Sequence, residues 1–245
     1  MKKREIKLKL EDVKAEILYH TFQNFEVNTL LVSFKEKRRI LSTWDGYREV
    51  NFVANHYQPP GLSEITMMDY PSFEEKFPAA LGIPHSDLSF LSTAANMDNV
   101  AVCEKSYNDL TVSCLATGGV GNALRSGVDG ANWMEQDGKF VKTHGTINII
   151  LLTNANLSEG AMARAIITAT EAKTAALQDM DARSSVSPEK QATGTGTDNM
   201  IIVSGKELGR PIRYSGGHTK IGELIGVSTK LAVAEAIKKQ ESSSK

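Results

Sequence analysis

The chain has 245 residues, of which 41% are hydrophobic and 23% are charged, and such values are typical of a globular protein with a sizeable core. Its 28 basic and 29 acidic residues give a net charge of −1, which leaves no basic excess for neutralising phosphates and argues against a nucleic-acid partner. No apolar run approaches the roughly 18 residues of a membrane span, and the alternating residues near the start do not resemble a signal peptide. We therefore expect a cytoplasmic protein without a membrane partner.

The first 60 residues predict a β-rich part of the fold, because short apolar or alternating runs follow one another there. The expected strands cover residues 6–10, 17–20, 29–34, 40–44 and 50–57. The charged run 36–39 predicts a turn between two of them, and Pro59-Pro60-Gly61 ends this group of strands.

The middle of the chain predicts one helix and three strands. The helix covers 71–81, with Pro71 near its start and Pro78 close to its end. The strands cover 88–93, 100–105 and 110–117, and a polar, glycine-bearing loop follows over 118–138. Cys103 and Cys114 could face each other across a hairpin, but free thiols are expected in a reducing compartment.

The last hundred residues interleave strands with two long helices. A nearly continuous apolar run predicts a buried strand over 145–153, and Ser158 is a suitable N-cap for a helix to about residue 180. Alanines recur every three or four residues along that helix, so one face is nearly bare. We expect a surface loop over 181–191, a strand over 200–204 and a helix over 219–239.

This pattern predicts a single α/β domain over residues 1–240, with its β-rich part over 1–60 and a disordered tail over 241–245. The expected architecture is a layered sandwich of mixed sheets and helices, of which a four-layer αββα arrangement is one version.

Two glycine-rich segments predict a functional site. Ala192–Asp198 reads ATGTGTD, and Ser215–Lys220 reads SGGHTK at the head of the last helix. Glycine is unfavourable by roughly 0.5–1 kcal/mol relative to alanine inside regular elements, so this density suggests sharp turns or a close approach to a ligand. Backbone N–H groups of 194–197 or 216–218 would suit a developing oxyanion, or would form a nest for a phosphate or carboxylate.

Several blocks in the same order resemble the adenosylcobinamide amidohydrolases, from about residue 88 to 237, while residues 1–85 match more loosely. The blocks are Gly121–Gly127 (GNALRSG), Gly145–Ile149 (GTINI), Thr170–Leu177 (TEAKTAAL), Ala192–Asp198 (ATGTGTD) and Gly217–Glu223 (GHTKIGE). The resemblance implies hydrolysis of the amide between the corrin ring and the aminopropanol arm of adenosylcobinamide, giving adenosylcobyric acid in cobamide (vitamin B12) salvage. It implies a corrinoid small molecule as partner, whose cobalt enters as part of the substrate, and no separate cofactor or protein-bound metal. A homo-oligomer is left open.

His218 is the strongest single candidate for proton transfer, because it lies between a glycine pair and a helix start, and because the intrinsic pKa of a histidine side chain, near 6.5, suits proton transfer at neutral pH. Glu223, on the first turns of that helix, could orient it. The alternatives are that His218 only caps the helix and that Glu223 only interacts favourably with its positive end.

Glu171 and Lys173 lie in the middle of the alanine-rich helix, where an i, i+2 pair faces different ways. Both belong to the family block, whereas simple surface exposure is the alternative. Asparagine offers donors and acceptors that suit the amide-bearing rim of a corrin. The candidate substrate-binding residues are Asn122, Asn148, Asn154, Lys173, Gly194, Gly196, Thr197, Asp198, Gly217 and Glu223.

The nucleophile has several candidates. Thr195 carries a hydroxyl group in a tight loop. A fainter similarity to aminopeptidases and ornithine acetyltransferases of the self-processing αββα type points to Thr93. A water activated by Glu171 or Asp198 is a further candidate. His56 could reach the site from the N-terminal strands. Two other functions stay open: a corrinoid-binding protein without chemistry, and a self-processing amidase or aminopeptidase.

Overall fold

The structure is a computed structural model that describes residues 2–130 and 145–243. Its helices are α1 (Pro60–Met68), α2 (Tyr70–Ala80), α3 (Glu159–Asp179) and α4 (Lys220–Ser243). Its strands are β1 (Lys2–Ile6), β2 (Val13–Phe22), β3 (Phe25–Ser42), β4 (Gly46–Tyr57), β5 (Leu88–Thr93), β6 (Ala101–Tyr107), β7 (Leu110–Gly118), β8 (Ala123–Leu124), β9 (Ile147–Thr153), β10 (Gly194–Thr195) and β11 (Asn199–Val203). Short 3-10 turns cover His85–Asp87 and Met97–Asn99.

Nine strands form one strongly curled sheet, in which β3 links two halves. The strand order is β1-β2-β3-β11-β9-β7-β6, and β4 pairs with both β3 and β5. The first part of β3 pairs with β2, and its last residues pair with β11, so this strand passes from one half of the sheet to the other. The remaining two strands, β8 and β10, form a separate antiparallel pair.

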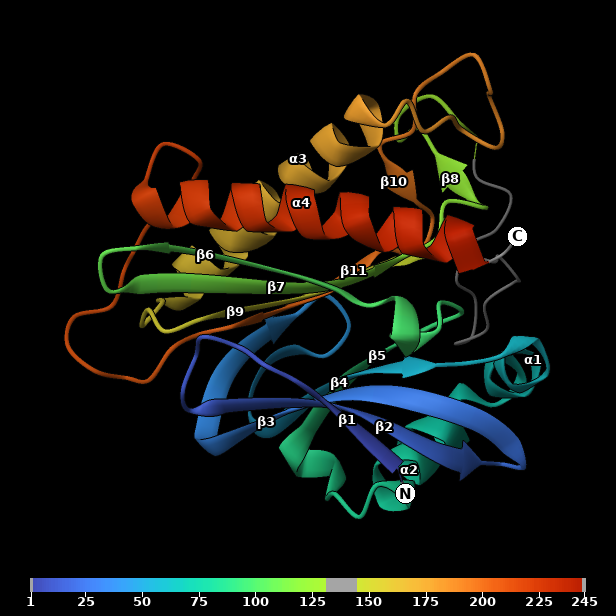
Figure 1. Ribbon diagram of the computed structural model, residues 1–245, viewed down its shortest axis with the longest axis horizontal. Coiled ribbons are helices and arrows are strands. Elements are labelled where there is room, and N and C mark those ends of the chain that lie inside the picture. The colour runs from blue at the N-terminus through green and yellow to red at the C-terminus, as the bar shows by residue number, and fades with distance from the viewer. Residues whose placement is uncertain (1, 131–144, 244–245) are drawn as a thin grey trace.

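Three apolar clusters show that the two halves of the sheet stack between two layers of helices (Figure 1). One cluster lies between α3, α4 and the strands β6, β7, β9 and β11. The second fills the space between the two halves of the sheet, and the third lies between β4, β5 and helix α2. This confirms the predicted α/β layered sandwich, in its four-layer αββα form.

Strand β9 contributes side chains to two of these apolar clusters, one on each face of the sheet. Side chains alternate between faces along a strand. Ile149 and Leu151 face the helices, while Ile150 and Leu152 face the other half of the sheet. Both faces are therefore buried, which explains the continuous apolar run in the sequence. Asn148 shares the face of Ile150 and so lies between the two halves.

Several predictions from the N-terminal part are wrong. The strand expected over 6–10 lies earlier in the chain, over Lys2–Ile6. The charged residues 36–39 were expected to form a turn, but β3 continues through them, with a register shift against β4 between Ser33 and Arg38. The buried Arg38 side chain forms an ion pair with Asp12, and the Arg39 Nε lies 2.7 Å from Glu207 Oε1. Ion pairs with residues far away in the sequence thus stabilise the charged part of β3 as a strand. Pro59-Pro60-Gly61 does end the strands, because β4 stops at Tyr57, but helix α1, which begins at Pro60, was not predicted.

The elements of the second half were predicted more closely. Ser158 caps α3 by accepting a hydrogen bond from the Ala161 N–H at 3.2 Å. Helix α4 continues to Ser243, so residues 241–243 are helical and not a disordered tail, while 244–245 lie outside the described residues. Cys103 and Cys114 face each other in the register of β6 and β7 as free thiols.

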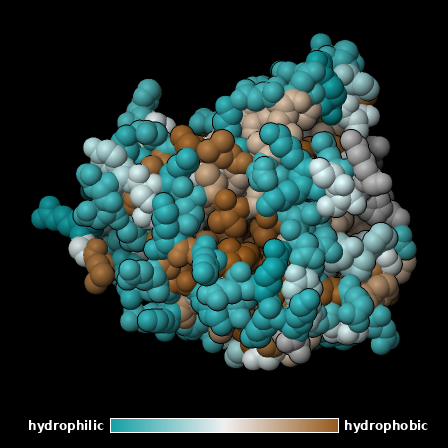
Figure 2. Space-filling model, viewed as in Figure 1, coloured by the Kyte–Doolittle hydropathy of each residue, from teal (hydrophilic) through white to brown (hydrophobic). Residues whose placement is uncertain are grey.

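Apolar side chains gather in the middle of one face, over α4 and the strands just below it (Figure 2). Val102 on β6 and Leu231 on α4 are among the large hydrophobic residues that remain exposed. Within residues 2–130 and 145–243, no helix is long and apolar enough to cross a membrane.

Candidate active site

A cavity of about 380 Å³ lies where the two halves of the sheet meet, at the end that also carries α1, β8 and β10 (Figure 1). We call the residues of its lining that carry hydroxyl, amide or carboxylate groups, with the glycines beside them, the polar wall, and the apolar and aromatic residues the apolar wall. The polar wall includes Ser92, Thr93, Gly145, Thr146, Gly196, Thr197, Asp198 and Asn199. The apolar wall includes Trp44, Met67, Tyr70, Phe90 and Leu91.

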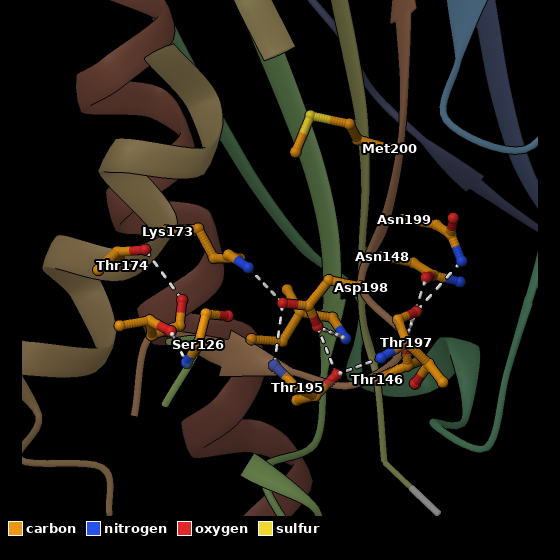
Figure 3. Close-up of polar contacts among 12 residues, drawn as sticks. Ser126, Thr146, Asn148, Lys173, Thr174, Thr195, Thr197, Asp198, Asn199 and Met200 are labelled. Atoms are coloured by element: carbon orange, nitrogen blue, oxygen red, sulfur yellow. Dashed lines mark hydrogen bonds and ion pairs between the residues drawn. The ribbon is translucent and has the colours of Figure 1, made fainter. Parts of the chain in front are cut away.

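Asp198 is the centre of the polar wall, because its carboxylate accepts four hydrogen bonds. Its Oδ1 accepts from the Thr195 hydroxyl at 2.5 Å and from the Ile147 N–H at 3.0 Å. Its Oδ2 accepts from the Thr195 N–H at 3.0 Å and from the Lys173 ammonium (Figure 3). The Lys173 and Asp198 side chains are only 7% and 12% exposed, so the ion pair is shielded from water. Shielding strengthens the interaction between the charges and makes removal of either partner costly.

Gly194 leaves room for this ion pair. A Cβ at this position would lie 2.5 Å from Asp198 Oδ2 and 2.6 Å from Lys173 Nζ, both closer than real contacts allow. Gly194 lies in β10, opposite Leu124 of β8, so this strand pair holds the backbone against the ion pair. The first glycine of the 192–198 run therefore allows the backbone to pack directly against the ion pair.

Two hydrogen bonds join the Gly145–Thr146 segment to Thr197 just before β9 begins. The Thr146 hydroxyl donates to the Thr197 carbonyl oxygen at 2.5 Å, and the Thr197 hydroxyl donates to the Gly145 carbonyl oxygen at 2.8 Å. Gly145 has φ +112°, a conformation that favours glycine, and a side chain there would collide with Asn122. Sequence reasoning did not select Thr146, although it belongs to one of the family blocks.

A buried amide network extends from the cavity into the space between the two halves of the sheet. Asn148 donates from Nδ2 to Asn55 Oδ1 and to the Ser92 carbonyl oxygen, both at 2.9 Å. Asn55 in turn donates to the Thr117 hydroxyl at 2.9 Å. The network fixes the end of β5, where Thr93 lines the cavity and its hydroxyl accepts from the Ala95 N–H at 3.0 Å.

The structure brings part of the predicted set together around this cavity. Thr93, Asn148, Lys173, Gly194, Thr195, Gly196, Thr197 and Asp198 lie on its polar wall or directly behind it. Asn122 lies beside Gly145, and both atoms of its side-chain amide are buried without a hydrogen-bond partner among the described residues.

The second glycine segment lies at the opposite end of the molecule (Figure 1). Asn148 lies near the start of β9 and Asn154 just after its end, which are about 20 Å apart at about 3.3 Å per residue. Asn154 uses its side chain to bind the β6–β7 turn, donating to the Asp109 carbonyl oxygen at 2.6 Å. Asn154 therefore lies beside the β6–β7 turn, far from the cavity.

His218 and its neighbours begin α4 at that far end. His218 and Gly217 are exposed, and it is Thr219, not His218, whose hydroxyl accepts a hydrogen bond from the Gly222 N–H at 3.1 Å. Glu223 pairs with Lys220 at 2.5 Å, and the Lys220 and Glu223 side chains are 39% and 54% exposed. The structure does not bring these residues to the cavity, and a catalytic role for His218 stays a prediction that no contact supports.

Glu171 and Lys173 do face different ways, as their spacing predicts, because Glu171 is exposed and Lys173 is buried. His56 is fully buried against Phe77, with ring centroids 4.3 Å apart, and Thr29 lies 2.8 Å from its Nδ1. Burial holds the pKa of His56 well below its ordinary value. This histidine is therefore part of the core and does not reach the cavity.

The apolar wall also supplies a polar group. Burial raises the pKa of the Tyr70 hydroxyl, with smaller contributions from Glu74 and Asp45, so Tyr70 stays protonated and can donate a hydrogen bond at neutral pH. Among the described residues, no three His, Cys, Asp or Glu side chains are grouped so that they could hold a metal ion.

Two solved structures share low similarity with the chain. A protein from Pyrococcus horikoshii has a TM-score of 0.45 at 13% identity, covering 94% of this chain and 84% of that one. The L-aminopeptidase D-Ala-esterase/amidase from Ochrobactrum anthropi, described as a variant of the Ntn-hydrolase fold, has a TM-score of 0.43 at 9% identity, with coverage of 93% and 83%.

Sequence relatives are closer. An uncharacterized protein from Methanocaldococcus jannaschii is 44% identical over 249 residues, which covers 96% of each chain. The adenosylcobinamide amidohydrolase of Methanosarcina mazei is 34% identical over 152 residues, covering 59% of this chain and 62% of that protein. The family model described as adenosylcobinamide amidohydrolase matches residues 14–245. The chain therefore belongs to the adenosylcobinamide amidohydrolase family.

Proposed function

We propose that this protein hydrolyses the amide between the corrin ring and the aminopropanol arm of adenosylcobinamide, giving adenosylcobyric acid. Membership of the family supports the substrate. The observation that carries the reaction class is the polar wall, where hydroxyl groups of three chain segments converge next to a shielded Lys173–Asp198 ion pair. Amide hydrolysis requires a nucleophile and fixed dipoles near the developing charge.

The hydroxyl of Thr146 is our candidate for the attacking group. It lines the cavity, it bonds to the carbonyl of Thr197, and the next residue, Ile147, donates its N–H to Asp198. Thr195 bonds to the same carboxylate but lies behind the wall. Thr93 is the competing hydroxyl, since it lines the cavity from the other half of the sheet.

The proposed reaction has two balanced steps. The threonine Oγ forms a bond to the amide carbonyl carbon, the carbon–nitrogen bond breaks, and the hydroxyl proton ends on the departing aminopropanol nitrogen. Water then cleaves the resulting ester, which releases the corrin carboxylic acid and restores the hydroxyl. The Gly196 backbone lies on the wall and is our candidate donor to the carbonyl oxygen during both steps.

The test is to incubate the protein with adenosylcobinamide and to follow adenosylcobyric acid and free aminopropanol by mass spectrometry. Thr146→Val and Thr93→Val are compared with the unchanged protein, and an early quench is searched for a corrinoid ester on the chain. Product from the parent and from Thr93→Val, but not from Thr146→Val, is expected. Product from Thr146→Val at the parental rate would contradict the assignment and favour Thr93 or an activated water.

Absence of product combined with tight binding of adenosylcobinamide would contradict the hydrolase and favour a corrinoid-binding protein. Cleavage of the chain itself, seen as two bands on a denaturing gel, would favour a self-processing amidase.

A further inference from the structure

The cavity is small compared with the proposed substrate. Pockets of roughly 300–1,000 Å³ enclose drug-sized ligands, and this cavity, at about 380 Å³, is near the lower limit. A corrin macrocycle with its amide side chains is much larger than such a ligand. If the cavity receives the scissile amide and its aminopropanol arm, the ring must therefore lie outside, against the rim.

Two large apolar side chains remain exposed at this rim although they line the cavity. Trp44 is 42% exposed and Met67 is 37% exposed. Trp44 belongs to the turn between β3 and β4, and Met67 belongs to α1. Exposed apolar groups that border a cavity with a few polar groups are typical of a ligand contact surface.

The Trp44 ring is held in place before any ligand binds. Its indole N–H donates to Glu74 Oε1 at 3.2 Å, and its ring lies edge-on to Tyr70 with centroids 5.1 Å apart. A fixed aromatic surface loses little conformational entropy on binding, which makes Trp and Tyr effective anchors. Methionine adapts its shape to an irregular surface such as the methyl-bearing face of a corrin.

We infer that Trp44 and Met67 form a platform for the face of the corrin ring, while the cavity beside them receives only the aminopropanol arm. This inference rests on the proposed function and assigns the specificity of the same site. Trp44 and Met67 line the same cavity as Thr146, Thr197 and Asp198, so a ring resting on the two apolar side chains can extend its arm into the cavity toward these polar residues.

The chain contains matched controls for both positions. Met68 follows Met67 in α1, does not line the cavity, and is 86% exposed because successive helical residues point about 100° apart. Tyr47 is an aromatic residue near the same β3–β4 turn, is 42% exposed, and does not line the cavity. Met68→Ala and Tyr47→Ala therefore remove similar exposed groups without touching the platform.

The experiment measures binding of adenosylcobyric acid, which has the ring but lacks the arm, by equilibrium dialysis. Trp44→Ala and Met67→Ala are each expected to weaken binding about 10-fold, while Met68→Ala and Tyr47→Ala stay within about two-fold of the parent. A thermal melt of each variant checks that the fold is intact, and Trp44→Phe is expected to retain most of the affinity.

Turnover of adenosylcobinamide, measured in parallel, separates this inference from the proposed function. Product formation with equal binding by all four alanine variants, or no binding of the acid by the parent, would overturn the platform while leaving the hydrolase intact. Binding that depends on Trp44 and Met67 without any product would support the platform and contradict the hydrolase. With both proposals correct, Trp44→Ala raises KM and leaves kcat near the parental value.

Discussion

The two glycine-rich segments of this chain have similar sequences of glycine and hydroxyl residues but different structural roles. In the 192–198 run, Gly194 makes room for Lys173 and Asp198, and the loop presents Gly196, Thr197 and Asp198 to the cavity. Just after the 215–220 segment, a side chain at Gly222 would collide with the carbonyl of Gly216, so the glycine at 222 permits close packing at the start of α4. Glycine density alone thus does not distinguish a site from a tight helix start.

Each of the two regions also contains a lysine–carboxylate ion pair, and the two pairs differ in their exposure to solvent. The Lys173–Asp198 pair is shielded between α3 and the cavity, whereas the Lys220–Glu223 pair lies on the surface. A shielded charge pair contributes strong fixed dipoles, and an exposed pair contributes little to stability or to chemistry. We therefore expect substitutions in the two regions to have very different effects.

The largest effect is expected for Asp198→Asn. Loss of this carboxylate should lower kcat about 100-fold or more, because one of its two acceptor oxygens becomes an amide donor that cannot accept from Thr195, Ile147 or Lys173. It should also lower the free energy of unfolding by about 3 kcal/mol, because the Lys173 ammonium stays buried without its partner.

The double variant Lys173→Met, Asp198→Asn separates these two effects. Stability measured by urea unfolding should recover toward that of the parent, since no unpaired charge remains, while the activity stays low. Recovery of both stability and activity would contradict a role for the carboxylate at the site.

A second comparison places an alanine in each glycine segment. Gly194→Ala should lower activity at least about 10-fold and reduce stability by about 1–3 kcal/mol, because its Cβ would overlap the Lys173–Asp198 pair. Gly217→Ala meets no atom within 4 Å and should be nearly neutral in both measurements. Equal losses from both substitutions would indicate that the two segments act together.

The histidines provide a test based on pH. Burial lowers the pKa of His56 well below 6.5, and also lowers that of His20, so the folded state takes up fewer protons than the unfolded state. Stability should be fully present above about pH 6.5 and should fall as the pH decreases below it, by up to about 1.4 kcal/mol per pH unit for each such group. Urea unfolding at several pH values measures this slope.

His56→Asn should flatten the slope, because it removes one buried imidazole, although it also lowers stability at neutral pH through loss of packing. The same slope in His56→Asn and in the parent would contradict the assignment of the pH dependence to this buried imidazole.

The smallest effects are expected at the far end. His218→Ala and Glu223→Gln should change kcat/KM by less than about two-fold and the free energy of unfolding by less than about 0.5 kcal/mol, because both residues are on the surface away from the cavity. Steady-state kinetics with adenosylcobinamide and urea unfolding measure both quantities.

The sequence predicted local elements well where the signal is local. The Ser158 cap, the buried run of β9 and the strand expected over 88–93 each reflect neighbouring residues, and these elements lie where they were expected. The turn expected at 36–39 failed because Asp12 and Glu207, both far away in the sequence, pair with the charged residues of β3.

The candidate site was predicted only in part, for a related physical reason. Asp198 and Lys173 lie in family blocks, but only the packing of α3 against β10 shows that they form a pair. Thr146 was overlooked because a threonine at the start of an apolar strand is an ordinary β-former, and nothing local marks its hydroxyl as facing a cavity. His218 was favoured because histidine suits proton transfer at neutral pH, a chemical property that says nothing of its position.

The most direct test of the account incubates adenosylcobinamide with the parent protein, Asp198→Asn and His218→Ala at equal concentrations and measures adenosylcobyric acid by mass spectrometry. We predict similar product from the parent and His218→Ala and at least about 100-fold less from Asp198→Asn. Loss of product with His218→Ala, together with retention in Asp198→Asn, would contradict the account and place the chemistry at the start of α4.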